Sequence, residues 1–194
     1  KNYKEIELKK DVNRIIKFYK NNGYKDVSVN TKVEYINQKN RFNLLFIINE
    51  GLKYEFSEFT VNFDSTTFDQ LITNEVLSLI KSYNNFIIEN KSFNVDLILK
   101  IRSDLSDLIY NSGINFFQIL INESIINSQV NILFDIENLT PKYVNLIHIN
   151  GNKLTQDYVI RRELEFAEGD AINKKLINDS INKIKSLDFF TNVL

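Results

Sequence analysis

Length, composition and charge exclude several classes of protein for this chain. It has 194 residues, 43% of them hydrophobic, and its 24 Lys and Arg residues oppose 25 Asp and Glu residues for a formal net charge of -1. This balance provides neither the basic surface that nucleic acid requires nor a polybasic membrane anchor. Cysteine is absent and His148 is the single histidine, which leaves too few ligands and nucleophiles for a zinc site or a catalytic triad.

No apolar run reaches the length of a spanning helix. The chain opens at Lys1 on a polar stretch without the apolar core of a signal peptide. If the native protein is exported, we therefore expect this sequence to be an internal piece of it.

Two stretches of the sequence share one order of elements. Residues 5–35 and 94–122 each show apolar residues at helical spacing, then a glycine, then a strand-like segment. Gly23 and Gly113 stand where a left-handed residue commonly ends a helix. The helical positions are Val12, Ile15, Ile16 and Tyr19 in the first stretch, and Val95, Ile98, Ile101, Leu105, Leu108 and Ile109 in the second.

The strand that ends each of these stretches is followed by a second strand. Alternating apolar residues predict a first strand with one buried face at Asp26–Tyr35, and the corresponding strand is expected at Asn115–Asn122. The following strands, Arg41–Asn49 and Gln129–Glu137, are richer in apolar residues. We therefore expect the later strand of each pair to occupy the central position of a small sheet.

The remaining segments complete a repeating pattern. We expect a strand at Tyr54–Phe63 before a helix at Phe68–Ser82, and a strand at Tyr143–Ile149 before a helix at Thr155–Phe166 with Thr155 as its N-cap. A last helix is predicted at Asn173–Leu187. The resulting order is strand, helix, helix, strand, strand, an α+β fold. Residues 52–138 hold one complete copy, residues 1–51 lack the first strand and helix, and residues 139–194 lack the last two strands.

The local sequence near the C-terminus resembles a known family. The run from Ile149-Asn150-Gly151 through Arg161-Arg162-Glu163-Leu164, followed by Glu168-Gly169-Asp170 and Leu187-Asp188-Phe189-Phe190, resembles the last POTRA repeat of the BamA family of outer-membrane assembly factors. Two positions depart from the family pattern, Asp188 in place of glycine and Ile114 in place of tyrosine. Asp tolerates the left-handed backbone that glycine supplies.

The resemblance implies tandem POTRA repeats, each a three-stranded mixed sheet packed on two helices. Counted back from the last repeat, the pieces are part of the third, the complete fourth and part of the fifth. It also implies a non-enzymatic arm at the periplasmic face of the bacterial outer membrane, without cofactor or metal. The implied partners are a BamD-type lipoprotein, other lipoproteins of the assembly complex, unfolded outer-membrane proteins and a C-terminal β-barrel outside this chain, but no nucleic acid.

Two sets of site residues follow. The resemblance matches the family's lipoprotein-contacting residues to Arg161 and Glu168, and we add the neighbouring Arg162 as a partner-binding residue. Strand edges offer unpaired backbone groups to extended chains. We accordingly expect unfolded clients to add as strands along Val27, Val29, Asn115, Phe116, Phe117, Gln118 and Ile119.

Simpler readings of the same residues stay open. Arg161 and Glu163 can be a solvated helix face with weak ion pairs, and Glu168-Gly169-Asp170 can be only a turn between helices. The repeats can also belong to a related secretion or translocation transporter. A purely structural spacer is a further alternative, and it predicts no affinity for extended peptides and no docking partner.

Overall fold

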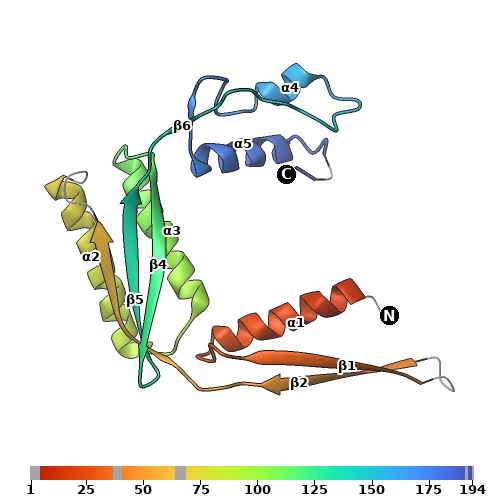
Figure 1. The fold of residues 1–194 in the computed structure, drawn as a ribbon, viewed down its shortest axis with the longest axis vertical. Coiled ribbons are helices and arrows are strands. Elements are labelled where there is room, and N and C mark those ends of the chain that lie inside the picture. Colours follow the sequence, from red (N-terminus) through yellow and green to blue (C-terminus); the bar gives the residue numbers. More distant parts are fainter. Residues whose placement is uncertain (1–4, 37–40, 64–68, 191, 194) are drawn as a thin grey trace. The chain divides into compact units, whose positions relative to one another are not determined.

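The fold is known from a computed structural model that describes residues 5–36, 41–63, 69–190 and 192–193 (Figure 1). Its contacts group the chain into two compact units. The first comprises residues 1–114 and 119–137, and the second comprises residues 115–118 and 138–194. None of the described helices is long and apolar enough to cross a membrane.

The first unit opens with a helix packed along a hairpin. Helix α1 (Glu5–Lys20) precedes strands β1 (Ser28–Ile36) and β2 (Arg41–Asn49), which pair antiparallel from Ser28↔Asn49 to Ile36↔Arg41. Gly23 ends the helix region with φ +101°, and a Cβ there would come within 2.9 Å of the Ser92 hydroxyl. Glycine at this position therefore serves both the backbone turn and a close approach.

Most of a complete repeat lies in the same unit. Strand β3 (Glu55–Phe63) is followed by helices α2 (Gln70–Glu89) and α3 (Val95–Asn111) and by strands β4 (Phe117–Ile126) and β5 (Gln129–Asn138). The sheet order is β3-β5-β4, with β3 parallel to β5. The expected three-stranded mixed sheet is therefore confirmed, and β5 occupies the centre as its apolar content predicted.

The core of this repeat lies between the sheet and its two helices. Burial alternates along β5, so one face of the strand packs inward while the other stays partly open. The largest fully buried side chains of the repeat are Phe59, Phe93, Phe134, Ile101, Leu105, Ile109, Ile132 and Ile136. Buried side chains recur every second residue on the sheet and about every 3.6 residues on the helices, as the sequence pattern predicted.

Helix α2 differs in its bounds from the expected Phe68–Ser82. Phe68 lies outside the described residues, and the helix begins after Asp69, whose carboxylate accepts a hydrogen bond from the Ile72 N–H at 2.8 Å. It continues to Glu89 because the buried Ile87 extends its apolar face beyond Ser82. Helix α3 ends before Gly113, which has φ +91° as expected for a helix-ending glycine.

The second unit has less regular structure than the sequence predicted. The expected strand Tyr143–Ile149 is wrong beyond Tyr143, since only β6 (Lys142–Tyr143) forms, paired antiparallel with β7 (Ala171–Ile172). A strand requires a partner for its backbone groups. Within the described residues, the short segment β7 is the only partner that β6 has.

Of the two helices expected in this unit, one is shorter than predicted and one matches its prediction. The expected helix Thr155–Phe166 is reduced to α4 (Asp157–Arg161), and its N-cap is Gln156 instead of Thr155. Helix α5 (Lys174–Ser186) matches its prediction, since Asn173 caps it by accepting from the Leu176 N–H at 2.9 Å. Asp188 adopts φ 55°, so it takes the left-handed conformation expected at this position.

The three sheets formed by the described residues fall one each within residues 1–51, 52–138 and 139–194. We retain these bounds as a proposal for the repeat boundaries, beside the two units that the contacts define.

Candidate functional site

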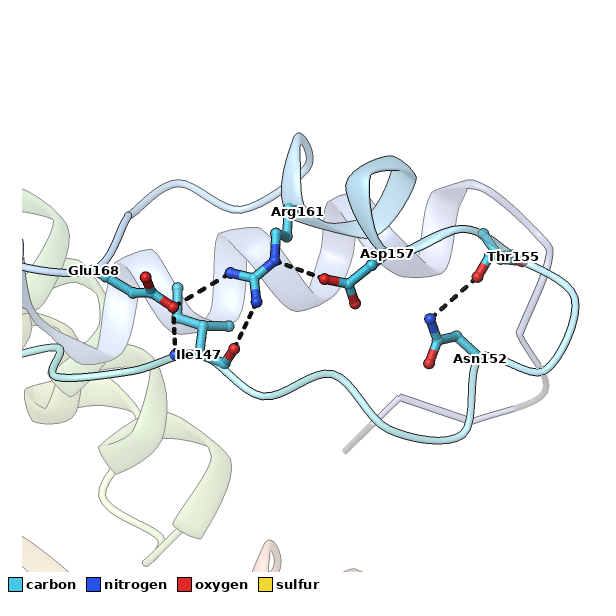
Figure 2. A network of polar contacts seen from close by, with 6 residues as sticks. All are labelled: Ile147, Asn152, Thr155, Asp157, Arg161 and Glu168. Atoms are coloured by element: carbon cyan, nitrogen blue, oxygen red, sulfur yellow. Dashed lines mark hydrogen bonds and ion pairs between the residues drawn. The ribbon is translucent and has the colours of Figure 1, made fainter.

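Arg161 lies at the centre of a polar network in the second unit (Figure 2). Its Nε donates to Asp157 Oδ2 at 2.7 Å, and its Nη2 donates to the Ile147 carbonyl oxygen at 2.7 Å. Its Nη1 lies 3.5 Å from Glu168 Oε1, which also accepts from the Ile147 N–H at 2.9 Å. Two of the predicted docking residues, Arg161 and Glu168, are thus in contact with each other and with the backbone of Ile147.

Local structure explains how each group reaches this point. Asp157 and Arg161 are the first and last residues of α4, and the spacing of four places their side chains on one face of the helix. Glu168 precedes Gly169, which has φ +94°. The turn is held to the end of β6 by two bonds, from Gly169 N–H to Val144 O at 2.7 Å and from Val144 N–H to Asp170 O at 2.9 Å.

The network is only partly shielded from solvent. The side chains of Arg161 and Glu168 are 39% and 41% exposed. The hydrogen bond that Arg161 donates to Asp157 is the main cause that raises the pKa of Arg161, so the guanidinium stays charged. Glu168 Oε2 accepts no hydrogen bond within the described part of the chain. The arrangement therefore holds a fixed cation beside a carboxylate whose second oxygen, Oε2, makes no hydrogen bond within the described residues.

Arg162 lies outside this network. Its Nε donates to Glu163 Oε1 at 3.0 Å, and its side chain is 61% exposed. The structure therefore brings together two of the three predicted docking residues, and the third makes a separate exposed ion pair, a weak kind of contact.

The predicted client-binding residues lie at the beginning of edge strands. Asn115 and Phe116 precede β4, and Phe117, Gln118 and Ile119 are its first residues. In the first segment, Val27 directly precedes β1 and Val29 lies within it. The side chains of Val27, Phe117 and Ile119 are buried, so a client at these positions would have to bind through backbone groups.

The opposite edge of the complete repeat is closed by the chain itself. The Asn84 side chain of α2 donates to Phe59 O at 2.8 Å and accepts from the Phe59 N–H at 2.8 Å. Further back on β3, the Phe56 N–H donates to Lys91 O at 2.6 Å, and Glu55 forms an isolated bridge with Ser92. No comparable side-chain or loop bond to the backbone of residues 120–126 of β4 occurs within the described residues.

Sequence reasoning missed two residues of the candidate sites. Asp157 was not singled out as a site residue, although its spacing of four from Arg161 could have indicated a pair. Asn84 carried no signal, because its partner Phe59 lies 25 positions away. Among the described residues, no group of three or more His, Cys, Asp or Glu side chains could hold a metal ion.

Comparison with protein-family models matches residues 1–51 and 142–193 to the model "POTRA: Surface antigen variable number repeat". Together these ranges make up more than half of the chain. The chain belongs to the POTRA family. The complete POTRA repeat between the two ranges is recognised from its βααββ order in the structure.

Relatives of this POTRA chain include curated assembly factors. It is 29% identical over 194 residues to the outer membrane protein assembly factor BamA of Buchnera aphidicola, and 22% identical over 195 residues to that of Neisseria meningitidis. Each match covers 98% of this chain but only 30% and 23% of the relative. The chain therefore spans less than a third of the length of the curated relatives it matches. Because these relatives are assembly factors, the expectation of a protein that is not an enzyme is supported.

Solved structures support the fold of the POTRA repeats. The crystal structure of Haemophilus influenzae BamA POTRA3-5 matches the whole chain with a TM-score of 0.71 at 18% identity, and 74% of that chain is covered. BamA from Haemophilus ducreyi lacking POTRA domains 1-3 matches 72% of this chain and 24% of its own, with a TM-score of 0.53 at 13% identity. The predicted resemblance to BamA POTRA repeats is confirmed.

Proposed function

We propose that this POTRA chain is a periplasmic arm in the assembly of outer-membrane β-barrels and that it receives unfolded barrel precursors by strand addition at β4. Its curated relatives are named as outer membrane protein assembly factors, which supports the process. The edge strands support the binding mode, because backbone hydrogen bonds give affinity that depends little on the client's sequence.

The observation that carries this proposal is the asymmetry of the two sheet edges. Asn84 and residues 91–92 bond to backbone groups of Phe59, Phe56 and Glu55 in β3, while β4 forms the opposite edge of the sheet. An extended client would therefore meet competing bonds at β3 and an available strand at β4. A sheet edge that is left long and uncovered is a template for another chain.

The turn before β5 indicates which backbone groups of β4 a client would use. Asn127 and Ser128 have φ values of 50° and 64°, as in a two-residue type I′ hairpin turn. The residues that flank such a turn form a hydrogen-bonded pair, and these pairs alternate along the strands. The N–H groups of Ile121, Glu123 and Ile125 are therefore inferred to point away from β5.

Proline substitutions test this proposal directly. Ile121→Pro and Ile125→Pro remove outward N–H groups and should weaken binding of a labelled barrel-strand peptide severalfold, with little change in the circular dichroism spectrum. Ser124→Pro removes an inward N–H group, so it should unfold the hairpin instead. Binding is measured by fluorescence anisotropy. Unchanged affinity in both folded variants would refute strand addition at β4 and would favour the spacer alternative.

We further propose that Arg161 and Glu168 dock an assembly-complex lipoprotein of the BamD type. Intramolecular bonds hold both side chains before the partner arrives, which lowers the entropy cost of docking. A partner arginine could donate to Glu168 Oε2 while Oε1 keeps its bonds to Ile147 and Arg161.

Charge reversal tests this docking. Glu168→Lys should abolish capture of the lipoprotein in a pull-down, and Glu168→Gln should weaken it while keeping an oxygen acceptor for the Ile147 N–H. Lys174→Glu is a matched reversal at an exposed position of α5. Rescue of Glu168→Lys by an opposite reversal on the lipoprotein would support direct contact. Undiminished capture by both Glu168 variants would contradict it.

A further inference from the structure

The helical face of the complete repeat carries a shallow groove that the proposed strand-binding edge does not use. The groove has a volume of about 650 Å³ and lies between α2 and α3. It is lined by Leu71, Ile72, Glu75, Leu79, Asp104, Asp107, Leu108, Asn111 and Ser112. Its walls therefore combine aliphatic side chains from both helices with carboxylates from both helices.

Some apolar side chains along this groove are exposed to solvent and contribute little to the core of the repeat. Leu71 is 68% exposed, although Ile72 beside it is buried in the core. Phe86, 50% exposed, lies seven residues after Leu79 and so continues the same face of α2. An apolar stripe along a seam between two helices is the kind of surface that receives the apolar face of a third helix.

The charge of the groove selects the partner. Three of the nine lining residues are acidic and none is basic, whereas the whole chain has a net charge of only -1. Glu75 and Asp107 form no ion pair with any described residue. Asp104 accepts from the Tyr83 hydroxyl, which fixes its carboxylate at the seam. The lining of this groove is therefore more acidic than the chain as a whole.

We infer that the α2–α3 groove docks a lysine- or arginine-bearing amphipathic helix of a partner protein. The leucines of the groove would contact the apolar face of that helix, and Glu75, Asp104 and Asp107 would meet cations along its margins. Complementary charges of this kind increase the association rate and fix the orientation of docking. The surface is separate from β4, so the chain would hold a strand client and a helical partner at the same time.

A designed peptide serves as the probe. It is an amphipathic helix of about 18 residues with leucines on one face and lysines flanking them, long enough to form a helix on binding. A second peptide carries glutamates in place of the lysines. Fluorescence anisotropy with the 194-residue chain should detect the lysine peptide, with affinity that falls as salt rises, and should show little binding of the glutamate peptide.

Paired variants locate the binding. Glu75→Lys combined with Asp107→Lys should weaken the lysine peptide roughly tenfold or more, and Leu71→Ser should also weaken it. The matched controls are Glu58→Lys on β3 and Leu77→Ser, a 48% exposed leucine of α2 that does not line the groove. Ile125→Pro should leave helix binding intact, which separates this inference from strand addition at β4.

Several outcomes would overturn the inference. These are failure of the lysine peptide to bind, equal binding of both peptides, or equal losses in the groove variants and their controls. Analytical ultracentrifugation tests whether a second copy of this chain occupies the groove instead. If Leu71→Ser abolishes a concentration-dependent dimer, the groove binds a second copy of this chain, and the proposal of a basic partner helix is wrong.

Discussion

At the scale of single residues, Glu168 has two roles that different substitutions can separate. Its Oε1 accepts from the Ile147 N–H and from Arg161, which supports the local fold, while its charge is available to a partner. Substitutions that keep a side-chain oxygen acceptor at position 168 preserve the first role. Substitutions that remove the whole polar end of the side chain lose both roles.

Amide hydrogen exchange at Ile147 measures the first role. Glu168→Ala removes the acceptor of this N–H, so its exchange should accelerate roughly tenfold, as expected for loss of one hydrogen bond to a charged group. Glu168→Gln should accelerate it less. Arg162→Ala lies outside the network and should leave it unchanged. An Ile147 rate that is the same in all three variants would show that the bond contributes nothing to the local fold.

Tyr83 provides a residue-scale prediction about alkaline pH. Burial and a hydrogen bond to Asp104 raise the pKa of Tyr83 from 10.0 to about 12. The folded state therefore holds this proton more tightly than the unfolded chain. Its contribution to stability is present below pH 10 and is lost between pH 10 and about 12. Tyr83→Phe should reduce the fall in urea midpoint between about pH 9 and about pH 11. An identical fall in both proteins would contradict this assignment.

At the scale of secondary-structure elements, Asn84 links the middle of α2 to the edge of β3. Its amide satisfies both the N–H and the carbonyl of Phe59, which a helix side chain can do only if the helix crosses the strand at that position. The same contact keeps other strands away from β3, so one residue couples folding to the choice of binding edge.

Removing this amide should have a measurable cost. Asn84→Ala leaves two partly buried backbone groups without partners, and we expect a loss of about 1–3 kcal/mol in the free energy of unfolding. Ser82→Ala is the control on the same helix, because the Ser82 hydroxyl bonds only to Leu79 O of its own helix. It should change stability by less than about 0.5 kcal/mol. Urea denaturation compares the two, and equal effects would refute the role given to Asn84.

At the scale of the first unit as a whole, a group of contacts joins the α1 segment to the complete repeat. Asp96 accepts from Lys17 Nζ at 3.0 Å and from Asn21 Nδ2 at 2.7 Å. Tyr54 donates its N–H to Gly23 O at 2.8 Å and its hydroxyl to Asp26 at 2.5 Å. Only Leu8 and Val27 are buried hydrophobic residues in the described part of 1–51, so these contacts stabilise a segment with little core of its own.

Asp96 makes this connection sensitive to acid. The hydrogen bond from Lys17 is the main cause that lowers the pKa of Asp96 below 3.8. Its contribution is therefore present above pH 3.8 and is lost as the pH falls through the lowered value. Asp96→Asn should increase proteolysis near residues 50–53 at neutral pH and remove this part of the acid dependence. Asp11→Asn, which alters only a pair within α1, is the control. Equal cleavage of both variants would contradict this role.

The sequence by itself determined the features that depend on neighbours along the chain. Helical periodicity gave α3 and α5, the glycines at 23 and 113 ended their helices, and the rich apolar content of Gln129–Glu137 correctly predicted the central strand. The resemblance at residues 149–190 identified the POTRA repeats because it rests on a local run of residues. Such signals need only a few consecutive positions, so no knowledge of packing was required.

Only the tertiary structure decided which groups meet across long separations. Arg161 bonds to a carbonyl 14 positions away, and Asn84 closes an edge 25 positions away. The expected strand Tyr143–Ile149 and the longer helix at 155–166 failed for the related reason that local propensity is weak and tertiary partners decide whether an element forms. The acidic groove likewise arises only when α2 and α3 lie side by side, because its carboxylates come from both helices.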